Sequence, residues 1–251
     1  MKVGLFIPCY VDQFFPEVGR ATVEILEAQQ IEVDFPQRQT CCGQPAWNAG
    51  LRDEARELAS NFERIFADYE YVVAPSASCV AMVRKHYLDQ DGAGKDAESC
   101  RNRVLELCEF LWTTLGLRKL PGAFPHRVGL HQGCHGLRDL KLGPSTELVH
   151  ESTPDPTAGL LQSIKGLELV PLSRPDECCG FGGTFAWSES AVSVRMGEDR
   201  LADHERAGAE ILASTDSSCL AHLSGIWRRR GEHRPVMHVA EILAGHAPQW
   251  P

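Results

Sequence analysis

The 251-residue sequence predicts an α/β protein made of two similar domains, each with a mainly parallel sheet flanked by helices. Short apolar runs alternate with amphipathic segments, which is the order in which parallel strands and their crossover helices follow one another. The tripeptide Cys-Cys-Gly occurs twice, at Cys41-Cys42-Gly43 and at Cys178-Cys179-Gly180. The two halves can also be aligned, Val3 to Cys9 with Val128 to Cys134, and Val104 to Leu111 with Val236 to Leu243. These matches indicate an internal duplication whose period is too long for a solenoid repeat.

In the first half, period-2 and short apolar runs predict strands, and 3.6-residue spacing predicts helices. The helix over Leu51 to Phe66 is the clearest, because Leu51, Ala55, Leu58 and Phe62 share one face. The predicted strands are Lys2 to Ile7, Ile31 to Phe35 and Tyr71 to Ala74, and the predicted helices are Pro16 to Gln29, Leu51 to Phe66, Val80 to Leu88 and Arg101 to Leu115.

The segment 120–126 has the Pro and Gly content of a linker, and the same plan restarts after it. We therefore expect a first domain over 1–119, a linker over 120–126 and a second domain over 127–251. In the second half the predicted strands are Arg127 to His131, Leu167 to Pro171, Glu210 to Ala213 and Pro235 to Met237, and the predicted helices are Thr157 to Ile164, Ser188 to Arg206, Leu220 to Arg229 and a last helix ending at Ala244.

Eight of the ten cysteines fall into two matching sets of four, and each follows a predicted strand or lies in the loop after one. The carboxyl ends of parallel strands meet at one edge of a sheet, so each set is expected to gather around one crevice. The first set is Cys9, Cys41, Cys42 and Cys79, and the second set is Cys134, Cys178, Cys179 and Cys219. Of the remaining two, Cys108 is interpreted as a core residue and Cys100 as incidental.

Four thiolates at one site suit an iron–sulfur centre or a closed structural zinc site. Zinc sites of this kind commonly use paired CxxC sequences, and neither set contains one. A redox dithiol would also favour CxxC. Helices after each Cys-Cys-Gly would direct backbone amides toward an anionic centre. An iron–sulfur cluster is thus the first candidate, zinc the second, and ordinary buried cysteines the third.

The overall composition excludes several other classes of protein. The formal net charge of −9 argues against a nucleic-acid partner or an anionic membrane surface. No apolar stretch approaches the roughly 18 residues of a membrane span, and the N-terminal apolar run is too short for a signal peptide. In a reducing compartment, the ten cysteines are unlikely to form structural disulfides. We expect a cytoplasmic protein without direct membrane insertion.

The doubled pattern resembles the cysteine-rich CCG domain family, which includes a cluster-binding subunit of heterodisulfide reductase and the iron–sulfur subunit of glycolate oxidase. The stretches Phe6 to Tyr10, Cys41 to Pro45, His131 to His135 and Cys178 to Gly183 carry the resemblance, which covers essentially the whole chain. It implies that the eight cysteines bind iron–sulfur clusters, taken to be [4Fe-4S], with up to one per domain. In family members with five cysteines per domain the pattern ends in CxxC. Here Ser76 and Asp216 stand at the first position of that pair, which leaves four thiolates per site.

The resemblance further implies an electron-transfer subunit of a complex that oxidises L-lactate or a related 2-hydroxy acid, with the other subunits as partners. Two alternatives stay open: a thiol or disulfide reductase that uses a non-cubane cluster, and a scaffold protein with structural zinc. No acid or base for hydroxy-acid oxidation is identified in the sequence. His131 and His135 flank Cys134 and are interpreted as ordinary loop histidines, with a contact to cluster sulfur as the alternative.

Overall fold

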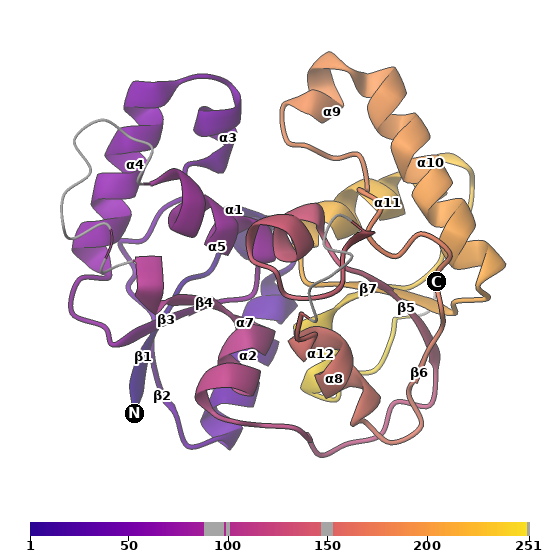
Figure 1. Ribbon diagram of the computed structural model, residues 1–251, viewed down its shortest axis with the longest axis horizontal. Helices are drawn as coiled ribbons and strands as arrows, with labels where there is room; N and C mark the ends of the chain where they lie inside the picture. Colours follow the sequence, from indigo (N-terminus) through magenta and orange to yellow (C-terminus); the bar gives the residue numbers. More distant parts are fainter. Residues whose placement is uncertain (88–97, 99–100, 147–152, 250–251) are drawn as a thin grey trace.

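Two four-stranded parallel sheets lie side by side, one in each half of the chain (Figure 1). The computed structural model describes residues 1–87, 98, 101–146 and 153–249. The strand order is β2-β1-β3-β4 in the first sheet and β6-β5-β7-β8 in the second, so the same topology occurs twice. The strands are β1 Lys2–Leu5, β2 Glu32–Asp34, β3 Tyr71–Ala74 and β4 Val104–Glu106, then β5 Arg127–His131, β6 Glu168–Leu169, β7 Ile211–Ser214 and β8 Val236–His238. The predicted fold class is confirmed.

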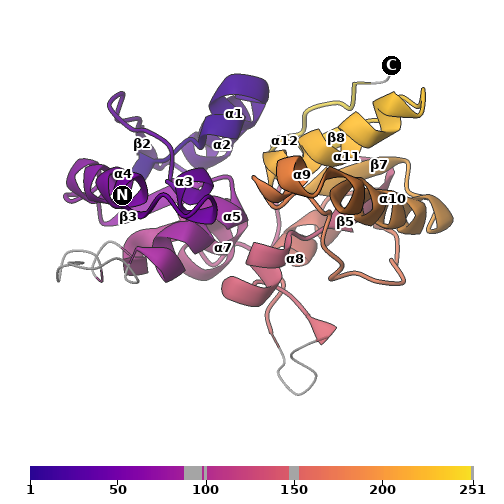
Figure 2. The same cartoon turned by 90° about the horizontal axis from the view of Figure 1, so that it is seen from above.

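Helices cover both sheets, and short helical turns begin at several of the strand ends (Figures 1 and 2). In the first half they are α1 Cys9–Phe14, α2 Pro16–Ala28, α3 Gln44–Asn48, α4 Arg52–Ile65, α5 Ala77–Ala81, the π-helical turn η1 Met82–His86, α7 Leu107–Glu109 and the π-helical turn η2 Phe110–Thr114. In the second half they are the π-helical turn η3 His135–Asp139, α8 Pro156–Gln162, α9 Phe185–Ser188, α10 Ser190–Arg206, α11 Ser217–Arg229 and α12 Val239–Leu243.

One predicted helix is interrupted by a strand. The segment expected to be helical over Arg101 to Leu115 contains the strand β4, which pairs with β3 in the register Val73↔Leu105. Helical structure resumes only at α7, whose first turn is capped by the Glu106 side chain. Val104, Leu105 and Glu106 are all buried, so neither face of the strand is exposed, and its apolar residues fall into phase with those of the helix that follows.

The two halves share one hydrophobic core. Helix α12 of the second half packs on α2 of the first half, and α8 of the second half packs on α7 of the first. Figure 1 shows α2 and α12 near each other between the two sheets. A single cluster of buried residues includes Ile25 and Leu107 from one half and Leu160 and Ile242 from the other. This packing fixes how the two sheets face each other, and so sets the relation between their strand ends.

The connecting segment 120–126 is packed against the second half. Leu120 and Phe124 are buried. The Phe124 amide donates to the Lys165 carbonyl at 2.9 Å, and the Leu120 amide donates to Ser163 Oγ at 3.2 Å. The connecting segment is therefore packed on the second half of the chain.

Candidate metal centre

The four cysteines of the first set come together at the carboxyl ends of β1, β2 and β3. Cys9 starts α1 directly after β1, Cys41 and Cys42 lie in the loop after β2, and Cys79 lies in α5 after β3. The Sγ atoms of Cys9 and Cys41 are 3.7 Å apart, and those of Cys42 and Cys79 are 3.3 Å apart. The expected gathering of this set at the sheet edge is what the geometry shows.

The second set repeats this arrangement at the ends of β5, β6 and β7. Cys134 precedes η3, Cys178 and Cys179 lie in the loop after β6, and Cys219 lies in α11. The Sγ atoms of Cys134 and Cys178 are 3.9 Å apart, and those of Cys179 and Cys219 are 3.1 Å apart. All eight cysteines are free thiols. Cys108 is buried in the core as expected, and Cys100 lies outside the described residues.

A backbone amide points at a sulfur in both Cys-Cys-Gly loops. The Gly43 amide donates to Cys41 Sγ and the Gly180 amide to Cys178 Sγ, each at 3.4 Å. Both glycines have positive φ, +85° and +89°, the left-handed region that L side chains disfavour. The turn conformation and the amide–sulfur contact thus arise from the same glycine.

The thiols of each set share protons unequally. Hydrogen bonds from Cys42 and Cys9, with help from the Gly43 amide, lower the pKa of the Cys41 thiol below its ordinary value. In the second set, bonds from Cys134 and Cys179 lower the pKa of Cys178. The thiolate is the form that binds metal, and metals bind such sites with release of the remaining protons. In each set, the first cysteine of the Cys-Cys-Gly motif, Cys41 or Cys178, is therefore the thiol that loses its proton most readily.

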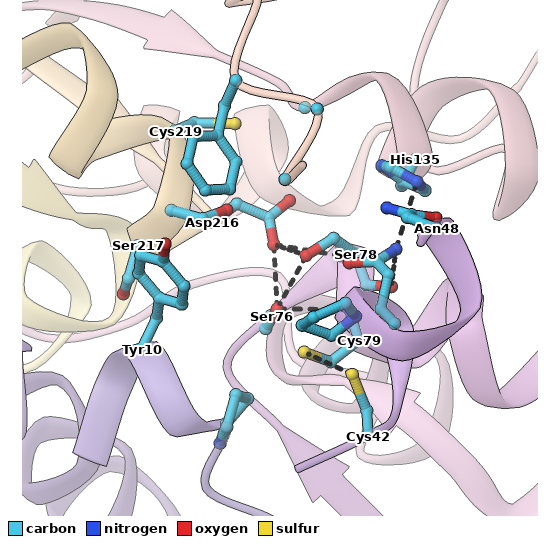
Figure 3. A pocket seen from close by; sticks show the side chains of 18 of the residues that line it. Tyr10, Cys42, Asn48, Ser76, Ser78, Cys79, His135, Asp216, Ser217 and Cys219 are labelled. Carbon is cyan, nitrogen blue, oxygen red and sulfur yellow. Dashed lines mark hydrogen bonds between the residues drawn. The ribbon is translucent and has the colours of Figure 1, made fainter. Parts of the chain in front are cut away.

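Both sets line one cavity of about 480 Å³ between the two halves, part of which is shown in Figure 3. All eight cysteines contribute to its wall. Tyr10, Phe181 and the largely exposed Trp187 add aromatic surface, and the Tyr10 and Phe181 rings meet edge to face at 5.6 Å. The two candidate centres therefore open into a common space, which the sequence did not predict.

A hydrogen-bond cluster joins the halves at the wall of this cavity (Figure 3). Asp216 Oδ1 accepts bonds from Ser76 Oγ at 2.8 Å, Ser78 Oγ at 2.7 Å and the Ser78 amide at 3.0 Å. Ser76 and Asp216 stand at equivalent positions, three residues before Cys79 and Cys219, and both are buried. The sequence shows that Ser76 and Asp216 occupy equivalent positions in the two halves. Their contact with each other could not be predicted, because it depends on how the two halves pack together.

Two histidines, His131 and His135, lie near the second cysteine set in different environments. His135 lines the cavity, with its Nδ1 3.6 Å from Cys134 Sγ and its Nε2 3.2 Å from Gln44. His131 ends β5, as the strand predicted over Arg127 to His131 requires, but it is fully buried, so its interpretation as an ordinary loop histidine is wrong. Burial and the nearby Arg200 guanidinium lower the pKa of His131 to about 3, so its imidazole is neutral.

The model of the CCG cysteine-rich domain matches this chain twice, over residues 3–84 and 128–224. The chain belongs to the CCG cysteine-rich domain family. The two matches contain the two cysteine sets, one in each. The match over most of the chain agrees with the duplicated topology of the sheets.

Relatives of this CCG protein extend over nearly its whole length. The chain is 40% identical over 246 residues to "Lactate utilization protein A" of Geobacillus kaustophilus, covering 97% of this chain and 98% of that one. It is 38% identical over 248 residues to "Lactate utilization protein A 2" of Bacillus cereus strain Q1, with the same coverage. Among solved structures, a putative Asp/Glu racemase from Yersinia pestis aligns over 97% of this chain and 95% of its own, at 12% identity and a TM-score of 0.38.

The chemistry of the donor sets fits a bound metal or cluster. Each half offers four thiols in two close pairs, with an amide directed at one sulfur. Close buried thiols without a disulfide are the donors that iron–sulfur clusters and structural zinc require. Within the described residues, no helix is both long enough and apolar enough to cross a membrane.

Proposed function

We propose that this protein is an iron–sulfur electron-transfer component of a system that oxidises L-lactate or a related 2-hydroxy acid, with one [4Fe-4S] cluster in each half. The observation that carries the proposal is the pair of matched four-thiol sets lining one cavity. The relatives named as lactate utilization proteins support the substrate class. Free thiols support a cytoplasmic location, where they stay reduced.

In this proposal each set would hold its cluster through its four cysteines: Cys9, Cys41, Cys42 and Cys79 in the first half, and Cys134, Cys178, Cys179 and Cys219 in the second. A cluster so held takes up and releases single electrons. The Gly43 and Gly180 amides would stabilise negative charge on the sulfurs and so raise the potential. The rigid strand ends would keep the two centres in a fixed relation.

We assign the chemical step on the hydroxy acid to a partner protein of the same system. Besides the cysteines, the titratable side chains that line the cavity among the described residues are Tyr10, His135 and Asp216. His135 is engaged with Cys134 and Gln44, and Asp216 with Ser76 and Ser78. The cavity side chains therefore serve to hold the centres and the halves together, and the protein would receive electrons from that partner.

Metal and sulfide analysis of anaerobically purified protein tests the proposal. We expect brown protein with about eight irons and about eight sulfides per chain, since each [4Fe-4S] cluster carries four of each. Cys42→Ser and Cys179→Ser should each remove about half of the iron, and Cys108→Ser, in the core, should leave the iron content unchanged. Colourless protein without sulfide would contradict the proposal.

The link to lactate needs a separate measurement. In the presence of its partner proteins and L-lactate, the clusters should bleach as they are reduced, and D-lactate or buffer should produce no bleaching. Clusters that stay oxidised with L-lactate and the complete set of partners would remove the lactate assignment while leaving the clusters in place.

Structural zinc is the second candidate, and the spacing of one sulfur pair in each set favours it. Zinc–sulfur bonds of about 2.3 Å in a tetrahedron place two sulfurs about 3.8 Å apart. The Cys9–Cys41 and Cys134–Cys178 pairs, at 3.7 and 3.9 Å, match that separation. The other pair in each set, Cys42–Cys79 at 3.3 Å and Cys179–Cys219 at 3.1 Å, is shorter than a zinc tetrahedron requires. The same elemental analysis decides, because two zinc sites would give about two zinc ions per chain and no sulfide.

A further inference from the structure

His131 is a buried polar side chain beneath the second cysteine set. Its ring is 0% exposed, and neither ring nitrogen has a hydrogen-bond partner among the described residues. A ring nitrogen and the Sγ atoms of Cys179 and Cys219 all lie within 4.8 Å of one another. Although these sulfurs face the cavity, His131 is not among the residues that line it. The imidazole thus approaches the sulfurs from the sheet side.

An unpaired polar group at this depth is costly. A buried donor or acceptor without a partner costs about 1–3 kcal/mol, so most such groups in proteins are satisfied. A neutral imidazole is also the form that binds iron and zinc. The position of His131 beside two thiols gives one of its two ring nitrogens a chemical role, binding a metal, that would satisfy that nitrogen.

We propose that His131 is a fifth, nitrogen ligand of the metal centre in the second half, in addition to its four thiols, which makes that centre a mixed nitrogen–sulfur site and the first an all-sulfur site. This inference rests on the proposed function, since it requires a metal centre at the second set.

The first half carries a hydrocarbon ring at the equivalent position. Phe6 aligns with His131, because Val3 to Cys9 matches Val128 to Cys134. The Phe6 ring packs against Phe62 at a centroid distance of 4.9 Å and against Phe66 at 5.9 Å. The same position of the duplicated fold therefore holds an imidazole in the second half and a hydrocarbon ring in the first. A metal-binding role for His131 explains this difference.

A buried cation lies behind His131. Arg200 is fully buried, and its Nε donates to His204 Nε2 at 3.2 Å. One guanidinium nitrogen pairs with Asp203 at 3.5 Å, and another has no partner among the described residues. A nearby positive charge stabilises the added electron of the reduced cluster. A neutral nitrogen ligand also opposes that electron less than a negatively charged thiolate does. We therefore expect the second centre to have the higher reduction potential.

Nitrogen coupling in pulsed electron paramagnetic resonance tests the ligand directly. The full chain is prepared anaerobically with ¹⁵N-labelled histidine and reduced with dithionite, because only the reduced [4Fe-4S] cluster is paramagnetic, and iron and sulfide are measured on every sample. The test variant is His131→Phe, which copies the first half, and the matched control is His135→Gln, a histidine beside Cys134 on the cavity side. We expect strong nitrogen coupling in wild-type protein and in His135→Gln, and its loss in His131→Phe.

The outcomes separate this inference from the proposed function. Iron-loaded wild-type protein without strong nitrogen coupling overturns the His131 assignment and leaves the clusters standing, as does coupling that survives in His131→Phe. If His131→Phe fails to fold, the labelled wild-type protein and His131→Gln decide. Zinc in place of iron overturns the cluster proposal, and X-ray absorption then tests His131: sulfur-only ligation overturns the assignment, and nitrogen in addition supports it. Protein that binds neither metal overturns both.

Discussion

Asp216 holds the two halves together at the wall of the cavity. Its buried carboxylate accepts three hydrogen bonds from Ser76 and Ser78, which belong to the other half of the chain. Ser76 also caps α5, because its Oγ accepts from the Cys79 amide at 3.3 Å. One side chain therefore connects the helix that carries Cys79 with the helix that carries Cys219.

Replacing Asp216 should destabilise the protein strongly. Asp216→Ala leaves the Ser76 and Ser78 donors buried without their acceptor, and hydrogen bonds to a charged group are worth about 1.5–3 kcal/mol each. We expect the free energy of unfolding to fall by at least about 2 kcal/mol in denaturant titration. Asp216→Asn keeps an oxygen acceptor and should lose about half as much.

The matched control for this prediction is Asp53→Ala. Asp53 is exposed, and its ion pair with Arg56 lies on the surface of α4. Such pairs contribute about 0–1 kcal/mol. Equal losses for Asp53→Ala and Asp216→Ala would mean that the contact between the halves adds little.

Glu106 gives the protein a pH dependence of known sign. Burial raises the pKa of this carboxyl to about 8, from an ordinary value of 4.5. Between these values the folded protein keeps a proton on Glu106 that the unfolded chain has released, so the contribution of Glu106 to stability falls as pH rises from about 4.5 to about 8. Glu106→Gln cannot ionise and should flatten this part of the profile, measured by denaturant unfolding at pH 5 and pH 8.

Glu54→Gln, exposed on α4, serves as the control for Glu106 and should keep the wild-type profile. A profile that Glu106→Gln leaves unchanged would show that another group causes the slope.

At the scale of single elements, the two Cys-Cys-Gly turns have the same shape but different surroundings. A Cβ on Gly43 would lie 3.4 Å from Leu58 Cβ, which is ordinary contact with α4. A Cβ on Gly180 would lie 2.5 Å from the Ser193 carbonyl oxygen and 2.7 Å from Met196 Cβ, both on α10. The second turn is therefore packed more tightly under its helix than the first.

This difference predicts unequal effects of one substitution. Gly43→Ala should cost about 1–2 kcal/mol, the penalty of a left-handed conformation. Gly180→Ala should cost about 1–3 kcal/mol more, since it adds overpacking against a helix backbone. Thermal unfolding of the two variants, side by side, measures the difference. Equal midpoints would contradict it.

A helix or strand could be predicted from the sequence when its own residues showed a clear hydrophobic pattern with distinct ends. The long helices α2 and α4 and the strand β3 were predicted because each has a clear face or a clean boundary. The strand β4 was missed because three buried residues run straight into α7. Its counterpart β8 was predicted, so the alignment of Val104 to Leu111 with Val236 to Leu243 contained the correct answer.

The sequence predicted the two cysteine sets but not how the two halves combine around them. Strand ends placed each set of four cysteines, because parallel topology alone brings those ends together. The common cavity and the bond between Ser76 and Asp216 were not predictable, since they depend on packing between the halves. His131 was misjudged although the predicted strand ended at it, because its burial depends on packing near Arg200 of α10, which the sequence pattern of the strand does not show.

At the scale of the whole molecule, the duplication extends to the contacts between the halves. Helix α2 packs on α12, and the equivalent helices α8 and α7 pack on each other. Helix α1 also contacts α11, as η3 contacts α5. Each contact recurs with the halves exchanged, which is the pattern of an approximate two-fold relation. The cavity lies on this relation, with one cysteine set from each half.

The shared core predicts that neither half is stable alone. Fragment 1–119 would expose the face of α2 that α12 covers, including Val18 and Ile25, and fragment 127–251 would expose Val239 and Ile242. Burying a side chain of this size is worth about 1.5–3 kcal/mol, so several exposed at once exceed much of the stability of an ordinary domain. We expect neither fragment to unfold cooperatively by itself in circular dichroism melts, and an equimolar mixture to do so. Cooperative melting of 1–119 alone would instead establish it as an independent domain, with the second half added to a fold that was already complete.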